Sequence, residues 1–96
     1  MALKVTVRFF TTLREITGHK EENIELSETA AVNLLLKQLS SKYGKEFDDY
    51  MFDELGYVHG HLQILINGQS VTTMRGLTTK LKEGDQVAIL PPVGGG

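Results

Sequence analysis

Apolar and polar residues alternate strictly near the start of the chain. From Leu3 to Phe9 the apolar side chains take every second position, and Lys4, Thr6 and Arg8 take the positions between them. A period of two is typical of a β-strand with one face buried. The same alternation over shorter runs predicts three further strands, at 23–26, 61–66 and 86–90.

The clearest helical pattern lies in the middle of the chain. Its apolar side chains recur at spacings that place them on one face of an α-helix: Val32, Leu35, Leu36, Leu39 and Tyr43. Residues 27–29 offer capping side chains before this helix, and Gly44 is a natural stop after it. A single shorter helical turn is predicted at 11–17, ended by Gly18.

The second half of the chain contains one strong turn signal. Asn67-Gly68 predicts a type I′ hairpin, because both residues tolerate positive φ, and it leads into a short return strand at 69–71. The connection around Leu77 and Leu81 is expected to be partly helical. Residues 45–60 have the weakest pattern, and we expect their large apolar side chains to cover an edge of the core: Phe47, Tyr50, Met51 and Phe52.

This order of elements predicts an α+β fold with two layers. One amphipathic helix can cover one face of a mixed sheet of four or five strands, and the helical crossover lets the first and last strands pair in parallel. That arrangement is the β-grasp, or ubiquitin-like, fold, assigned to residues 1–90 with an extended, flexible tail at 91–96. The predicted core comprises Val5, Val7, Val32, Leu36, Leu39, Ile64, Ile66, Val87 and Ile89.

Composition narrows the classes of function. The chain has 96 residues, a net charge of −2 and no cysteine, so one domain is expected and thiolate chemistry, including that of persulfide carriers and plant-type ferredoxins, is excluded. Its basic residues form no stripe, which disfavours direct binding of nucleic acid. It has neither a membrane-spanning apolar run nor a secretory signal pattern. We therefore expect a cytoplasmic protein that is monomeric when free.

Two groups of residues are candidate metal ligands. His59 and His61 are two positions apart and would share one face of a strand, but no third ligand has a clear spacing. The acidic residues between 46 and 54 are interrupted by large apolar residues, which favours a solvated loop or helical turn. No metal site is predicted.

The most informative segment is the tail, which follows the last predicted strand directly. Pro91 and Pro92 lack backbone N–H donors, so the sheet ladder must end there, and they favour an extended segment. Gly94, Gly95 and Gly96 then end the chain without side chains. The alternative is a frayed end or a remnant of an expression linker. A stiff Pro-Pro segment that holds three glycines away from the sheet favours a functional tail, whose carboxylate can enter a narrow channel in a partner.

A carboxylate is ionised at neutral pH and is a poor electrophile until one of its oxygens becomes part of a leaving group. The chain has no phosphate-binding loop or other ATP-binding motif. Activation of Gly96 must therefore come from another protein. The chain itself is predicted to be a carrier or substrate rather than an enzyme, with no bound cofactor.

Several motifs together resemble the MoaD/ThiS family of ubiquitin-like sulfur carriers, over nearly the whole chain. They are Leu13-Arg14-Glu15, the helix from Val32, Leu65-Ile66-Asn67-Gly68, Gly84-Asp85-Gln86-Val87 and the ending Pro91-Pro92-Val93-Gly94-Gly95-Gly96. The pattern is most similar to the MoaD proteins, the small subunits of molybdopterin synthase, and to the small archaeal modifier proteins. The last two motifs are the most specific.

The resemblance implies an E1-like partner that uses ATP to adenylate Gly96. The adenylate would become a thiocarboxylate that donates sulfur to a pterin precursor, with the larger molybdopterin synthase-type subunit as partner, or to tRNA. In the archaeal modifiers the same carboxylate can be joined to lysines of target proteins. A sulfur carrier, a protein modifier (or one protein that is both) and a plain β-grasp binding module with an unused tail remain open.

A partner-binding patch follows from strand parity. On the two strands the inward set is Leu62, Ile64, Ile66, Val87 and Ile89, and the outward set is Gln63, Leu65, Gln86, Ala88 and Leu90. Leu65, Ala88 and Leu90 are thus the apolar residues on the face that the helix does not cover. Contiguous exposed apolar surface usually marks an interface, and ubiquitin-like proteins resemble this pattern in using their open sheet face for partners. Scattered surface leucine is the alternative. We expect these three residues to form one patch close to the point where the tail departs.

Overall fold

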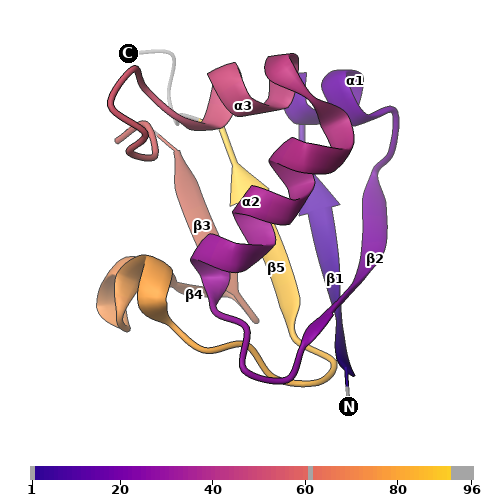
Figure 1. Ribbon diagram of the computed structural model, residues 1–96, viewed down its shortest axis with the longest axis vertical. Helices are drawn as coiled ribbons and strands as arrows, with labels where there is room; N and C mark the ends of the chain where they lie inside the picture. Colours follow the sequence, from indigo (N-terminus) through magenta and orange to yellow (C-terminus); the bar gives the residue numbers. More distant parts are fainter. Residues whose placement is uncertain (1, 61, 92–96) are drawn as a thin grey trace.

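The computed structural model describes residues 2–60 and 62–91. Its elements, in chain order, are β1 (Ala2–Phe9), α1 (Thr12–Thr17), β2 (Glu21–Ser27), α2 (Val32–Tyr43), α3 (Lys45–Met51), β3 (Gln63–Ile66), β4 (Gln69–Ser70), the 3₁₀ helices η1 (Val71–Thr73) and η2 (Gly76–Thr78), and β5 (Gln86–Leu90). Figure 1 shows α2 lying across the sheet.

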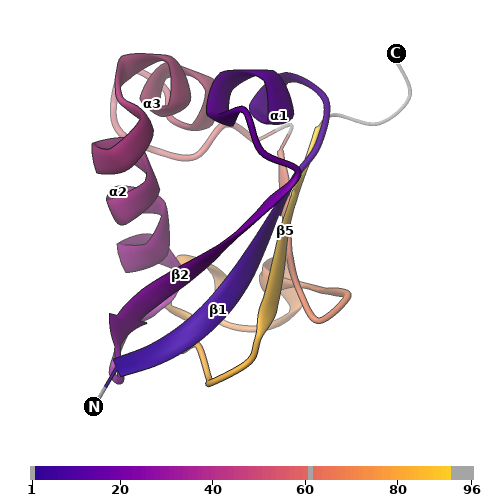
Figure 2. The same cartoon turned by 90° about the vertical axis from the view of Figure 1, so that its right-hand side faces the viewer.

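The sheet has the strand order β2-β1-β5-β3-β4. β1 and β5 pair in parallel, and the other neighbouring strands pair antiparallel. Figure 2 shows the sheet and α2 as two layers, with no described helix on the opposite face. The predicted α+β architecture and the parallel pairing of the first and last strands are confirmed.

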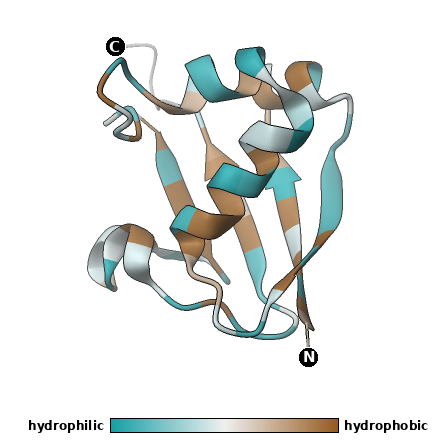
Figure 3. Cartoon of the chain, in the orientation of Figure 1, coloured by the Kyte–Doolittle hydropathy of each residue, from teal (hydrophilic) through white to brown (hydrophobic). Residues whose placement is uncertain are grey.

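The core lies between α2 and the inner face of the sheet. The predicted period of two is observed in β1, where Leu3, Val5, Val7 and Phe9 are buried and their neighbours are not. All nine predicted core residues are buried. The bands of teal and brown along β3 and α2 in Figure 3 follow the same periodicities. Burial of apolar area on one side of each element therefore fixes which sheet face stays open.

The start of α2 differs from the prediction. Ser27 belongs to β2, and the helix begins at Val32 with Ala31 as its N-cap and no side-chain cap. The backbone N–H of Val32 instead donates to the carbonyl of Thr79, at 3.0 Å. A long-range backbone contact thus satisfies a group that a capping side chain normally satisfies.

Residues 45–60 are more ordered, and more deeply packed, than the sequence indicated. Residues 45–51 form the helix α3, and the Phe47 and Met51 side chains are fully buried in the core. Tyr50 and Phe52 are partly buried against it. The prediction that these side chains cover an edge of the core is confirmed for Tyr50 and Phe52 and is wrong for Phe47 and Met51. The acidic side chains of this segment lie on α3 and in the turns that follow.

The hairpin and its surroundings combine confirmed and corrected predictions. Asn67 and Gly68 both have positive φ, of 51° and 86°, as a type I′ turn requires. The return strand β4 is shorter than predicted, because Val71 begins η1 instead of extending the ladder. The expected helical turn near Leu77 is η2. His59 lies in a connection, not on a strand, and His61 lies outside the described residues, so the shared strand face predicted for them is not observed.

Candidate functional site

The last strand lies at the centre of the sheet. Ile89 of β5 pairs with Phe9 of β1 on one side and with Ile64 of β3 on the other. The ladder ends at Leu90, and Pro91 follows as a half-buried residue outside the strand. The predicted end of the ladder before Pro91 is confirmed. Pro92, Gly94, Gly95 and Gly96 lie outside the described residues, so their predicted extension stays a prediction.

The open face carries the predicted apolar residues next to one another. Leu65 and Ala88 are direct partners in the register of β3 and β5, and Leu90 follows Ala88 by two residues on the same face. All three side chains are half-buried rather than fully exposed. We call Leu65, Ala88 and Leu90 the sheet patch. It runs along β5 towards the residue from which the tail departs.

Polar side chains cover the other half of the open face. Arg8 is the register neighbour of Ala88 on β1, and its Nε lies 3.9 Å from the Glu21 carboxylate on β2. Thr6 Oγ1 donates to Asn23 Oδ1 at 2.8 Å across the same strands. The open face therefore carries its apolar side chains over β3 and β5, with the exposed Gln63 and Gln86 on either side of them, and polar side chains over β1 and β2. An apolar centre with a polar rim is typical of a protein interface.

A loop at the same end of the molecule was not identified from the sequence as a functional element. Residues 53–58, which we call the Asp53 loop, follow α3 and lead towards β3. Leu55 and Tyr57 are 81% and 68% exposed. The spacing of Phe47, Tyr50 and Met51, at i, i+3 and i+4, was a usable signal for α3. No sequence pattern showed that the loop after it is held in place.

The clearest perturbed pKa values lie away from the sheet patch, where β2 meets the end of α2. Partial burial raises the pKa of Glu22, but hydrogen bonds from Lys42 and Tyr43 and the positive charge of Lys42 lower it by more, so its pKa lies below the ordinary value. Partial burial and then the bond to Glu22 raise the pKa of Tyr43 well above its usual range. Because Phe9 and Phe47 pack edge-on or tilted against the Tyr43 ring, this cluster stabilises the fold.

The described residues hold no cluster suited to a metal ion. Within 2–60 and 62–91, no three His, Asp or Glu side chains gather closely enough to bind one. None of the helices in those ranges is both long and apolar enough to cross a bilayer.

Comparison with known proteins places the chain in a family. The ThiS family matches residues 7–96, from the end of β1 through the final glycine. The chain belongs to the ThiS family. The resemblance inferred from the sequence motifs is therefore confirmed, and members of this family with established roles are carriers or modifiers of the ubiquitin-like type.

Relatives of this ThiS family member are named as small archaeal modifier proteins or as sulfur carrier proteins. Small archaeal modifier protein 3 of Haloferax volcanii is 34% identical over 98 residues, which cover 98% of this chain and 100% of the relative. Sulfur carrier protein CysO of Mycobacterium tuberculosis is 30% identical over 95 residues, which cover 98% and 100%. A structure of the Amycolatopsis orientalis BexX/CysO complex aligns with a TM-score of 0.75 and 29% identity, over 96% of this chain and 99% of the other.

Proposed function

We propose that this protein is a sulfur carrier whose Gly96 carboxylate is adenylated by an E1-like enzyme and converted to a thiocarboxylate. One observation carries the proposal: the family match extends through residue 96, directly beyond the point where β5 stops pairing at Leu90. The reactive terminus thus follows a strand anchored at the centre of the sheet.

Conversion of the Gly96 carboxylate to a thiocarboxylate requires two steps, both catalysed by another protein. A Gly96 carboxylate oxygen attacks the α-phosphorus of ATP, which gives an acyl-adenylate and releases pyrophosphate. A sulfur nucleophile at the oxidation state of hydrosulfide then attacks the acyl carbon, and AMP leaves. Because Gly96 has no side chain, nothing on that residue hinders the approach of the nucleophile to the acyl carbon or the departure of AMP. The thiocarboxylate supplies sulfur for molybdopterin or for tRNA thiolation, with a larger synthase-type subunit as partner in the first case.

The sheet patch gives the partner a place to bind. Leu65, Ala88 and Leu90 offer contiguous apolar surface next to the tail's departure point, and Pro91, Pro92, Gly94 and Gly95 form the arm that reaches the partner's catalytic site. Binding energy from the patch would hold the terminus at high effective concentration in that site.

A second function, conjugation to lysines of target proteins, is favoured by the relationship to small archaeal modifier protein 3. A lysine amine would attack the same activated acyl carbon in place of sulfur. One protein could perform both reactions, because they differ only in the nucleophile.

The test begins with the E1-like enzyme of the same cell and purified wild-type protein. ATP–pyrophosphate exchange that depends on the protein supports adenylation of Gly96, and its absence overturns the proposal. The intact mass of protein purified from its native cell then separates the two functions. A thiocarboxylate is heavier by the difference between a sulfur and an oxygen atom. Conjugation instead leaves a branched remnant on lysines of other proteins, and because Lys82 is the last basic residue, trypsin leaves residues 83–96 as that remnant.

A further inference from the structure

The Asp53 loop is held in one conformation by its first residue. The Asp53 carboxylate accepts hydrogen bonds from the backbone N–H groups of Leu55 and Tyr57, at 2.9 and 3.0 Å. The Asp53 N–H donates to the Tyr57 carbonyl at 2.8 Å, and the Gly56 N–H donates to the Asp53 carbonyl at 3.0 Å. Gly56 has a φ of 88°, which a side chain would disfavour. The loop therefore closes on itself through four hydrogen bonds to Asp53.

This ordered loop presents two large side chains to solvent. Leu55 is 81% exposed and Tyr57 is 68% exposed. Tyrosine is among the residues most enriched at the centres of protein interfaces. A pre-ordered loop loses little conformational entropy when it binds. The loop thus has the composition and the rigidity of a docking element.

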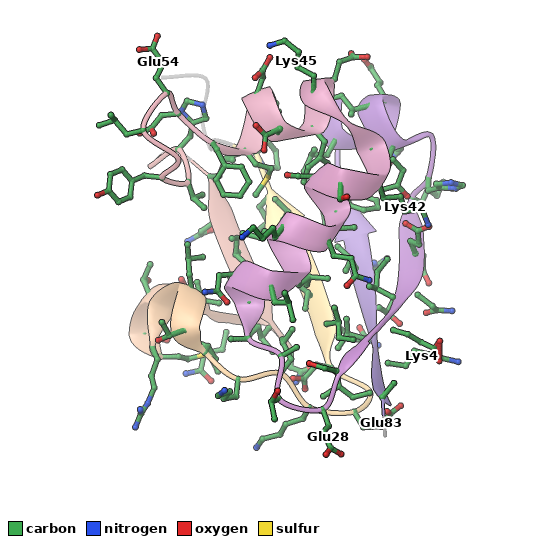
Figure 4. The ribbon with its side chains drawn as sticks, viewed as in Figure 1. Lys4, Glu28, Lys42, Lys45, Glu54 and Glu83 are labelled. Carbon is green, nitrogen blue, oxygen red and sulfur yellow. The ribbon has the colours of Figure 1, made fainter. Side chains whose placement is uncertain are left out.

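The charge of the surrounding segment is opposite to that of the rest of the chain. Residues 45–60 contain five Asp and Glu residues and one Lys, a net charge of −4, so the remainder carries +2 within a total of −2. Asp48 and Glu54 are exposed. Figure 4 shows Glu54 and Lys45 at one end of the molecule, with Lys4 and Glu83 at the other. The loop therefore favours a positively charged partner surface.

The loop also lies at the end of the sheet from which the tail leaves. Leu90, the last residue of β5, pairs with Gln63, the first residue of β3, and the loop precedes β3 by a few residues. Figure 1 shows α3 and the segment after it at the end of the sheet to which β5 points. Any protein that receives the terminus in a channel must approach this end.

We propose that the Asp53 loop is a second docking element for the enzyme that adenylates Gly96, with Leu55 and Tyr57 entering an apolar pocket rimmed by cationic side chains. This inference rests on the proposed function. An enzyme that binds ATP and a carboxylate must concentrate positive charge around its channel to hold both anions. The acidic segment beside the tail matches that charge, and the two apolar side chains supply contact area that charge alone does not.

The test is ATP–pyrophosphate exchange measured against the concentration of the carrier. The double variant Leu55→Ala/Tyr57→Ala is expected to raise KM about tenfold or more, as loss of interface anchors does, with kcat unchanged within about twofold because the terminus is intact. Met74→Ala, which truncates another exposed apolar side chain away from the loop, is the matched control and should leave both constants unchanged.

Asp53 provides a test of loop order. Asp53→Ala removes the acceptor for Leu55 and Tyr57 while both side chains remain, and it should also raise KM. Asp53→Asn keeps an acceptor oxygen for both N–H groups, so its KM should stay close to that of the wild-type protein. Glu54→Gln should raise KM at low salt and reduce its salt dependence, whereas Glu25→Gln on β2 should not.

The outcomes separate this inference from the function on which it rests. If wild-type protein supports no exchange, the proposed function fails and the inference fails with it. If wild-type protein is active and the double variant has an unchanged KM, or loses kcat alone, the inference is overturned while the function stands. Sedimentation that shows a wild-type dimer dissociated by the double variant would assign the loop to self-association and also overturn it.

Discussion

The side-chain amide of Asn67 donates a hydrogen bond to the buried carboxylate of Asp85, with 2.9 Å between Nδ2 and Oδ1. The amide oxygen of Asn67 accepts from the backbone N–H of Gln86, also at 2.9 Å. The second Asp85 oxygen accepts from the Lys82 N–H at 2.8 Å. The β3–β4 turn is thereby fastened to the turn that leads into β5, which explains why Asn-Gly and Gly-Asp occur together in this chain.

Substitutions at Asn67 should separate turn geometry from these hydrogen bonds. Asn67→Gly keeps the positive φ but loses both side-chain bonds, so it should lower the free energy of unfolding by roughly 1–3 kcal/mol. Asn67→Ala loses the same bonds and, unlike glycine, keeps a Cβ in the left-handed region without the polar side chain that lets Asn adopt it, so it should cost about 1 kcal/mol more than Asn67→Gly. Urea unfolding of the three proteins measures both differences. Equal stability of Asn67→Gly and wild type would show that the link to Asp85 contributes nothing.

The helix α2 offers a matched pair of leucines for testing the core. Leu36 is fully buried, whereas Leu34 on the same helix is 40% exposed. Leu36→Ala should reduce the free energy of unfolding by about 2–5 kcal/mol through lost burial and a residual cavity. Leu34→Ala should cost less than about 1 kcal/mol. A loss below about 1 kcal/mol for Leu36→Ala in thermal or denaturant unfolding would contradict the observed packing.

Local sequence patterns predicted the fold where one periodicity persisted long enough to be read. The alternation from Leu3 to Phe9 and the helical spacing from Val32 to Tyr43 each extend over several repeats, and both elements were located within a few residues. The Asn67-Gly68 turn was predicted because its positive φ values restrict the residue types. The inward positions of β3 and β5 then fixed the sheet patch by parity alone.

The features that were missed depend on contacts between distant segments. The first N–H of α2 finds its acceptor in Thr79, which no local signal at residues 27–29 could show. Phe47 and Met51 are buried because α3 packs against α1 and α2, and a seven-residue helix gives too few repeats for a firm assignment. The order of the Asp53 loop arises from one carboxylate that binds two backbone groups, and an aspartate in a loop has no sequence mark of that role.

The contacts of Glu22 with Lys42 and Tyr43 should make stability depend on pH. Because the pKa of Glu22 is below its ordinary value in the folded protein, its contribution is present above the unfolded-state pKa of about 4.3 and is lost as pH falls through the folded-state pKa. The Tyr43 pKa is raised, so its contribution is present below about pH 10 and declines at higher pH.

Glu22→Gln tests this sign directly. At neutral pH the variant should be less stable than wild type by about 1–3 kcal/mol, as expected for loss of charged hydrogen bonds. The difference should shrink as the pH is lowered below about 4, because the wild-type carboxyl then becomes protonated. Urea unfolding at a series of pH values measures it, with the exposed Glu25→Gln on the same strand as control. A difference that stays constant down to pH 2 would contradict the lowered pKa.

Removal of the last two glycines should separate activation from folding. Deletion of Gly95-Gly96 is expected to abolish ATP–pyrophosphate exchange, because the acyl group that accepts AMP is no longer at the required distance from β5. The free energy of unfolding should not change, since the sheet ladder ends at Leu90. Val93→Ala, which keeps the chain length, is the control. A truncated protein that the E1-like enzyme still adenylates would contradict the role assigned to Gly96.

The sheet patch can be tested at Leu65. Its side chain is only half-buried, and its strand pairs through backbone groups, so a substitution there should leave the fold intact. Leu65→Asp places a negative charge opposite Ala88, in the sheet patch. An apolar partner surface would have to desolvate that carboxylate without offering it a positive charge, which is costly. We expect affinity for the E1-like enzyme or the sulfur-accepting subunit to fall at least tenfold, as measured by calorimetric titration.

Two comparisons make the result specific to the patch. The free energy of unfolding of Leu65→Asp should change by less than about 1 kcal/mol, because half-buried surface positions tolerate polar substitution. Asn23→Asp adds the same charge to the polar half of the same face, retains the acceptor for Thr6, and should leave affinity nearly unchanged. Equal affinities of wild type, Leu65→Asp and Asn23→Asp would place the partner elsewhere. Equal losses in both variants would instead indicate that the net charge of the face, and not its apolar half, determines binding.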